Sequence, residues 1–158
     1  IGAQIAFYVQ NPVALRIGRR EPNIYNGLRE RIALNVMYLI GLAFRNGDPG
    51  CTTTTIATAI NIPGLTLGPV IADLESAGLI SATQEEALVP GRDPSRITLA
   101  DVLAAVRGGC ATGELVQPTW SGPVDDVAGR VEAAIAGLTT GTTLGEFLDQ
   151  AERRQSSA

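Results

Sequence analysis

The sequence contains no histidine, and its 12 basic residues are all arginine, so lysine is absent as well. Without lysine, the chain has no phosphate-binding loop of the Gly-x-x-x-x-Gly-Lys type. Its two cysteines, Cys51 and Cys110, are too few for a disulfide framework and lack the spacing of a metal-ligand motif. Zinc and haem sites depend on histidine or paired cysteine, so we expect no bound metal and no cofactor.

Charge is distributed unevenly along the 158 residues, which suffice for one domain with helical appendages. Residues 1–50 have a net charge of +3, residues 51–107 of −3 and residues 108–158 of −4, which together give the net charge of −4. The arginines that could bind phosphate groups are therefore concentrated in the first third of the chain.

Residues 1–23 combine an apolar segment with an arginine-rich junction. The stretch 1–9 (IGAQIAFYV) is shorter than the roughly 20 residues that span a bilayer. Arg16, Arg19 and Arg20 follow it. One interpretation is an amphipathic helix docked on the core, with the arginines in a solvated loop. The other, which we favour, is the cytoplasmic end of a membrane helix in a longer protein, with arginines that follow the positive-inside pattern and meet anionic headgroups.

The central segment, residues 24–108, has the order of a winged helix-turn-helix. We expect helices at 24–45, 52–60, 66–77 and 99–106, with a turn at 61–64 and a wing or irregular loop at 81–96. In the third of these ranges the apolar residues share one helical face: Leu67, Val70, Ile71, Leu74 and Ala77. The predicted fold class is mainly α, with a small β-wing and additional N- and C-terminal helices.

Local signals predict where these elements begin and end. Thr66 is expected to cap the 66–77 helix, so that Pro69 lies in its first turn, where a missing N–H costs no hydrogen bond. Gly78 is expected to end that helix in the left-handed conformation. Thr98 and Asp101 have the spacing of a capping box at the start of the next helix.

The last third of the chain is predicted to contain a linker at 109–122, a helical pair at 123–152 and a frayed tail at 153–158. Thr143 and Glu146 have the spacing of a capping box for the second helix of the pair. The apolar face of the pair comprises Val127, Val131, Ile135, Leu144, Phe147 and Leu148. This face either packs against its own domain or joins two chains in a homodimer.

Three stretches resemble the iron–sulfur-regulator (IscR-type) winged-helix proteins. They are LESAGLI at 74–80, ITLADVLAAV at 97–106 and TLGEF at 143–147. The resemblance covers residues 28–148 and implies DNA binding through the first helix, the reading helix and the wing. It also implies a dimer formed by a long helix near the C-terminus and a cluster held by three cysteines. Only Cys110 lies in the cluster region, so no cluster is expected here.

The beginning of the chain resembles a second family. Residues 1–8 (IGAQIAFY) and the QNP at 10–12 are similar to the end of the last membrane helix in the YihY/virulence factor BrkB family. Some members of this inner-membrane family, long labelled ribonuclease BN, continue into a cytosolic C-terminal domain. The resemblance implies a bacterial inner-membrane protein with this domain on the cytoplasmic side.

We favour a non-catalytic regulatory or interaction domain that can form a homodimer. The first alternative is a DNA-binding transcriptional regulator that contacts nucleic acid through Thr66, Arg92 and Arg96. It is disfavoured because the predicted reading helix has no arginine and holds Asp73 and Glu75. The sequence does not specify any small-molecule ligand.

A ribonuclease-type enzyme, as the historical label suggests, is the second alternative, and it is the less favoured one. A nuclease needs carboxylate-held metal ions or a histidine base. The acidic pairs Glu85-Glu86 and Asp125-Asp126 are adjacent in sequence, so their side chains diverge. Cys51 lies at the start of a helix, where a thiol pKa can fall, but no histidine can act as its base. We expect no catalytic residue.

Overall fold

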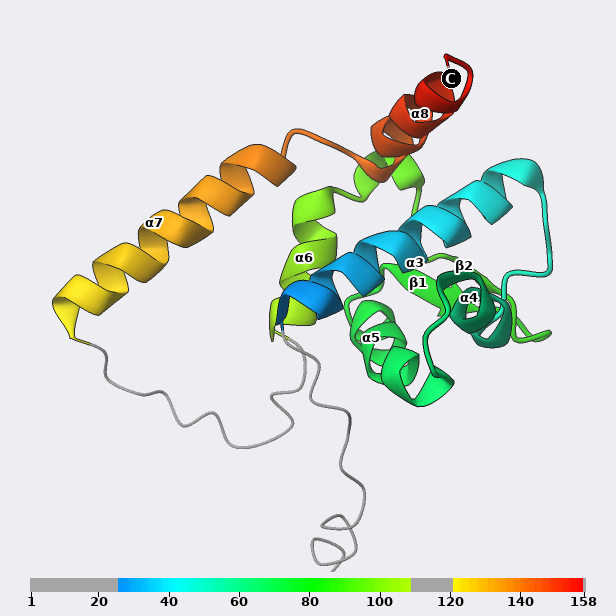
Figure 1. Cartoon of the computed structure of the whole chain (residues 1–158), viewed down its shortest axis with the longest axis horizontal. Coiled ribbons are helices and arrows are strands. Elements are labelled where there is room, and N and C mark those ends of the chain that lie inside the picture. The colour runs from blue at the N-terminus through cyan, green and yellow to red at the C-terminus, as the bar shows by residue number, and fades with distance from the viewer. Residues whose placement is uncertain (1–25, 109–120, 158) are drawn as a thin grey trace, which may run out of the picture.

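The computed structural model describes residues 26–108 and 121–157 and is mostly helical (Figure 1). Arg16, Arg19, Arg20, Cys110 and the junction predicted at 1–23 lie outside the described residues. The elements in chain order are α3 (Asn26–Asn46), α4 (Thr53–Ile60), α5 (Gly64–Ser76), β1 (Ile80–Ala82), β2 (Leu88–Pro90), the 3₁₀ helix η1 (Pro94–Arg96), α6 (Leu99–Gly108), α7 (Gly122–Thr139) and α8 (Leu144–Gln155).

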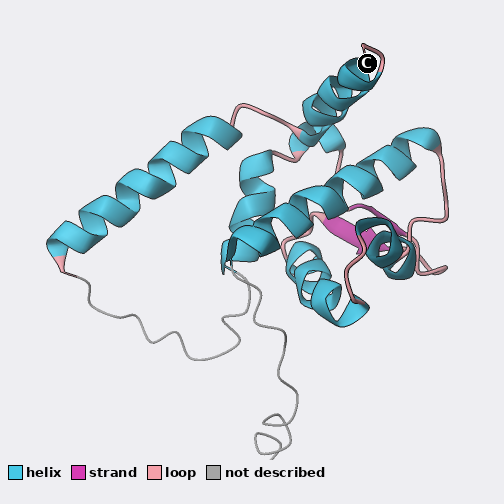
Figure 2. Ribbon diagram, viewed as in Figure 1, coloured by secondary structure: helices cyan, strands magenta, loops and turns pink. Residues whose placement is uncertain are grey.

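The core is built around α3, against which α4, α5, β2, α6 and α8 pack (Figure 2). Its buried residues recur every three or four positions, which is the spacing of a helix enclosed on one broad face. They are Ile32, Ala33, Val36, Met37, Ile40 and Gly41. The helix ends at Gly47, whose φ of 66° lets the Asp48 N–H turn back and donate to the Ala43 carbonyl at 2.8 Å.

The helix–turn–helix order is confirmed, with one shifted boundary. Thr52 caps α4 in a capping box with Thr55, and Asn61 ends α4 at φ 53°. The next helix, α5, begins at Gly64 after Pro63, two residues before the expected cap at Thr66. The prediction that Pro69 lies in the first turn is therefore wrong, since Pro69 lies inside the helix.

An interior proline is tolerated at this position because water can replace the missing hydrogen bond. In an α-helix the N–H of residue 69 would donate to the carbonyl of Leu65. Leu65 is 85% exposed, so it lies on the solvent side of the helix, where water can reach the backbone. The buried face of α5 is as predicted for Leu67, Val70, Ile71 and Leu74, whereas Ala77, just past the helix end, is exposed.

The predicted wing is a two-stranded hairpin. β1 and β2 are antiparallel, with Ile80 opposite Pro90 and Ala82 opposite Leu88. Gly78 precedes the hairpin at φ 67°, as expected. At the other end, a Cβ on Gly91 would lie 2.5 Å from the Gly78 carbonyl oxygen, so only glycine fits where the hairpin closes on α5.

The first turns of α6 and α8 are fastened to each other. The Leu99 N–H donates to the Thr142 carbonyl at 3.0 Å, and the Leu144 N–H donates to the Ile97 carbonyl at 2.7 Å. Both predicted capping boxes are confirmed: Thr98 with Asp101 at the start of α6, and Thr143 with Glu146 at the start of α8. These bonds fix where α8 leaves the body.

The two C-terminal helices are held by different elements. α8 packs on α3 and continues through Gln155, so the predicted frayed tail at 153–158 begins too early. α7 contacts α6 and otherwise projects away from the body (Figure 1). None of its residues is buried.

Candidate functional site

Asp73, in the second half of α5, is part of an ion pair inside the domain. The Asp73 carboxylate accepts a hydrogen bond from the guanidinium of Arg29 on α3, and the Asp73 side chain is only 12% exposed. The negative charge of Asp73 is therefore compensated by Arg29, and its carboxylate points towards α3. The expectation that Asp73 lies on the reading surface is corrected, because the ion pair draws its side chain to the packed side of α5.

The solvent-exposed side of α5 carries no cation. It presents Leu65, Ala72, Glu75 and Ser76, while Thr66 near the start of the helix is half-buried. Reading base edges in a DNA groove typically uses arginine, lysine, asparagine or glutamine, and none of these lies on α5. Thr66 and Ser76 are the only side chains here that can donate a hydrogen bond.

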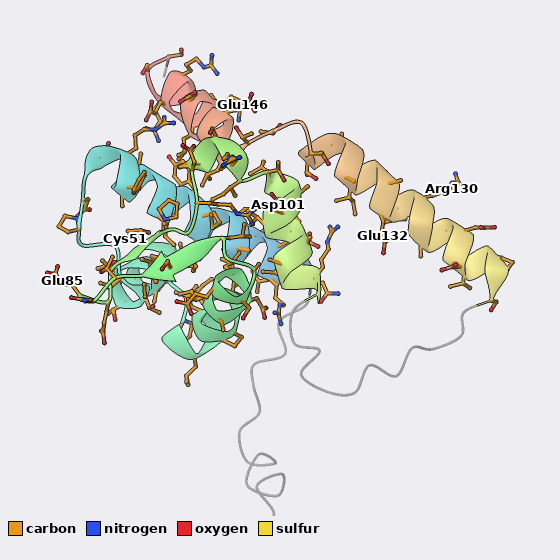
Figure 3. The ribbon with its side chains drawn as sticks, turned by 180° about the vertical axis from the view of Figure 1, so that it is seen from behind. Cys51, Glu85, Asp101, Arg130, Glu132 and Glu146 are labelled. Atoms are coloured by element: carbon orange, nitrogen blue, oxygen red, sulfur yellow. The ribbon has the colours of Figure 1, made fainter. Side chains whose placement is uncertain are left out.

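The wing presents acids where a DNA-binding wing would need cations. Glu85 and Glu86 are exposed in the loop that joins β1 to β2, and Glu85 lies at the hairpin end of the body (Figure 3). The two predicted nucleic-acid contacts on this side, Arg92 and Arg96, follow β2 instead of occupying the loop. Arg92 donates to the Ala77 carbonyl at 3.4 Å, next to the end of α5.

Cys51 is buried beside the hairpin and is not placed for nucleophilic chemistry. It is 7% exposed, and its carbonyl accepts a hydrogen bond from the Leu88 N–H at 2.6 Å. Burial raises the pKa of the Cys51 thiol, and the negative charge of Asp48 raises it further. The thiol is therefore protonated at neutral pH, which removes the thiolate that nucleophilic attack requires.

No cluster of three or more potential metal-ligating side chains occurs in the part of the chain that the structure describes. Within the same residues, no helix is both long enough and apolar enough to cross a membrane.

The predicted self-association face divides into two parts. Leu144 and Leu148 of α8 are each 1% exposed and belong to the core formed with α3, so they cannot also contact a second chain. Phe147 is half-buried and meets Tyr38 edge-on, with ring centroids 5.8 Å apart and an interplanar angle of 72°. For the α8 residues, packing on their own domain is the observed outcome.

The α7 part of that face remains open to solvent. Val127 is 57% exposed, Val131 is 53% exposed and Ile135 is partly covered. Val124 and Leu138 extend the same side of the helix and are exposed too. We call these five residues the α7 stripe. Figure 3 shows that most of α7, with its labelled Arg130 and Glu132, projects away from the body, and the contacts of the helix are with α6.

A groove between α3 and α8 was not predicted from the sequence. It has a volume of about 550 Å³. Its lining comprises Arg31, Leu34, Asn35, Tyr38, Phe147, Gln150, Ala151, Arg154 and Gln155. The two walls are more than 100 positions apart in the sequence, and only a prediction of the α3–α8 contact could have brought them together.

No protein-family model matches the sequence. A UPF0761 membrane protein from Rhodospirillum rubrum is 31% identical to this chain over 121 residues, which are 76% of this chain and 28% of that protein. The chain thus spans 28% of the length of this relative. Most of the chain is therefore similar to one segment of a membrane protein.

Solved structures establish the fold. IscR from T. potens matches with a TM-score of 0.62 and 20% identity, covering 88% of this chain and 93% of its own. CymR, the global cysteine regulator of B. subtilis, matches with a TM-score of 0.57 and 22% identity, covering 77% of this chain and 93% of its own. The fold is a winged helix-turn-helix. The predicted fold class is confirmed, and the winged helix here carries an acidic wing and a cation-free second helix.

Proposed function

We propose that this winged helix is a self-associating interaction domain on the cytoplasmic side of a bacterial inner-membrane protein. The observation that carries the proposal is the α7 stripe, an exposed apolar side of a helix that projects from an otherwise closed core. Exposed apolar area of this kind in a folded domain is typical of an interaction surface.

The partner that fits the α7 stripe is the α7 stripe of a second chain. The five residues of the α7 stripe, from Val124 to Leu138, recur at three- and four-residue spacing, so two such helices can pack along their length. An isologous pairing of the same surface closes the assembly as a dimer.

The membrane placement is supported by the relative, which is a membrane protein, and by the predicted arginine junction at 1–23. The resemblance to the YihY/virulence factor BrkB family remains a prediction. A reporter fused after residue 158 of the full-length protein tests the side of the membrane: green fluorescent protein should fluoresce there, and alkaline phosphatase should be inactive. Active phosphatase would contradict the cytoplasmic placement.

Sedimentation velocity over a range of concentrations tests self-association. We expect a concentration-dependent dimer that is lost in Val131→Asp, because an aspartate would be desolvated in the interface. The matched control is Ala133→Asp, which places the same side chain on the opposite side of α7 and should leave the dimer intact. The proposal would be contradicted if the wild-type chain stayed monomeric at the highest concentration, or if both variants lost the dimer equally.

A DNA-shift assay at low salt separates this function from that of a transcriptional regulator. We expect no shift, because the exposed side of α5 has no cation and the wing loop is acidic. A shift that disappears in the Arg92→Ala, Arg96→Ala double variant would favour the regulator instead.

A further inference from the structure

The groove between α3 and α8 is built on an apolar floor. Leu144 and Leu148 anchor α8 on α3 from below, and they leave Phe147 against Tyr38 as part of the groove. Leu34 and Ala151 contribute further half-buried apolar surface from the two helices. The aromatic pair thus contributes to an apolar side of the groove.

The polar lining of the groove carries positive charge and no negative charge. Arg31 of α3 and Arg154 of α8 line it together with the amide side chains of Asn35, Gln150 and Gln155, and no carboxylate does.

Within the described residues, some arginines of the domain are paired with carboxylates, and others, Arg31 and Arg154 among them, are not. Arg29, Arg45 and Arg107 each form an ion pair with a carboxylate. Among the residues that the structure describes, neither Arg31 nor Arg154 has a carboxylate within ion-pair distance. Their guanidinium groups are therefore available to an anion from outside the chain.

We propose that the α3–α8 groove binds a fatty-acid-type amphiphile, a single acyl chain with a carboxylate at one end. The acyl chain lies against Tyr38, Phe147 and Leu34, and the carboxylate meets Arg31 and Arg154. The volume of about 550 Å³ falls within the range of roughly 300–1,000 Å³ that is typical of small-molecule sites. An apolar floor with a few polar groups that fix orientation is the usual composition of such sites.

The occupant is inferred from charge complementarity. A neutral apolar ligand would leave Arg31 and Arg154 without an anionic partner. A free inorganic anion would leave Tyr38 and Phe147 without an apolar contact. A carboxylate on an acyl chain satisfies both parts at once. A membrane protein, such as the relative of this chain, lies next to a lipid bilayer, which is a source of acyl chains.

Isothermal titration calorimetry with decanoate, at concentrations below micelle formation, tests the proposal. We expect saturable one-to-one binding, and at least tenfold weaker binding in the Arg31→Gln, Arg154→Gln double variant. The matched control is Arg153→Gln. Arg153 neighbours Arg154 but does not line the groove, and its Nε donates to the Asp149 carbonyl of its own helix. This control should bind decanoate like the wild type.

Three further measurements sharpen the test. Ala151→Glu adds a carboxylate to the lining and should abolish decanoate binding while circular dichroism shows a folded domain. Decanol, the neutral analogue, should bind at least tenfold more weakly than decanoate, and inorganic phosphate should not bind measurably.

Equal binding of decanol and decanoate, or unchanged binding in the double arginine variant, would overturn the proposal. So would absence of decanoate binding together with a change of oligomeric state in the double variant, since the groove would then receive a second chain. Decanoate binding does not require the α7 stripe, so it should persist in Val131→Asp. The proposal therefore succeeds or fails independently of self-association.

Discussion

Gly41 of α3 lies directly against Leu148 of α8. A Cβ on Gly41 would be 2.9 Å from Leu148 Cδ1 and 3.4 Å from Leu144 Cδ2. The absence of a side chain at position 41 therefore lets α8 approach α3 closely enough to bury both leucines. The α3–α8 groove and the half-buried position of Phe147 depend on this close approach.

We expect Gly41→Val to lower the free energy of unfolding by about 1–3 kcal/mol, the usual cost of inserting volume into a packed core. The variant should also bind decanoate less well, because α8 is displaced. Urea denaturation followed by circular dichroism measures the first effect. Gly145→Ala on α8 is the control, since its Cβ would meet Ser95 only at 3.8 Å and should cost no stability. Equal stability of Gly41→Val and the wild type would contradict this account of the contact.

The ion pair between Arg29 and Asp73 fastens α5 to α3. Asp73→Ala leaves the partly buried guanidinium without its partner, and Arg29 Nε already lacks a hydrogen bond in the structure. We expect a loss of about 1–3 kcal/mol, typical of removing one partner of a charge-assisted hydrogen bond.

The control for this pair is Glu75→Ala, which removes an exposed acid two residues further along α5 and should change stability by less than about 0.5 kcal/mol. Arg29→Met combined with Asp73→Ala should cost less than the sum of the single changes, because the two residues interact. Additive costs in urea denaturation would show that the ion pair does not contribute to stability.

The capping box at the start of α8 supports the attachment of that helix. The Thr143 hydroxyl accepts a hydrogen bond from the Glu146 N–H at 3.2 Å, and the Glu146 carboxylate accepts one from the Thr143 N–H at 2.9 Å. Thr143→Ala should therefore cost about 0.5–2 kcal/mol in thermal or urea unfolding. Thr140→Ala is the matched control. Its hydroxyl bonds to the Ala136 carbonyl of its own helix, and its loss should have a smaller effect. Equal effects would show that the cap is not what holds α8.

Most signals contained within one helix or turn were predicted correctly from the sequence, and the start of α5 is the exception. The capping boxes at Thr98 and Thr143, the left-handed Gly78 and the buried side of α5 depend on neighbouring residues, and each is found in the structure. The start of α5 was misplaced because Thr66 is a good cap by residue type, whereas the turn after Asn61 already begins the helix at Gly64.

Features that join distant segments could not be read from the sequence. Periodicity shows that α8 has an apolar side, but not that Leu144 and Leu148 bury it against Gly41 of the same chain. Likewise, the sequence suggests that Asp73 is a surface acid, whereas in the structure it pairs with Arg29 of α3. The α3–α8 groove is a product of the same packing. For α7, by contrast, the pattern and the structure agree on an apolar side, and four of its five residues are exposed within the part of the chain that the structure describes.

The buried thiol of Cys51 should give the domain a distinct alkaline pH dependence. Burial first, and then the charge of Asp48, raise the pKa of this thiol above its ordinary value of 9.0. In the unfolded chain the thiol ionises near that ordinary value, whereas in the folded domain it stays protonated to higher pH. The contribution to stability is therefore complete below about pH 9 and is lost as the pH rises through the folded pKa.

In a Cys110→Ser background, the free energy of unfolding should accordingly fall more steeply above pH 9 than it does when Cys51 is also replaced by alanine. At pH 8 the native Cys51 thiol should react with a disulfide reagent at least tenfold more slowly than in urea, since both burial and protonation protect it. Asp48→Asn should make the alkaline loss of stability smaller, because one of the two causes of the raised pKa is removed. Rapid labelling of the native protein, or identical alkaline slopes with and without Cys51, would show that the thiol is not held protonated by the fold.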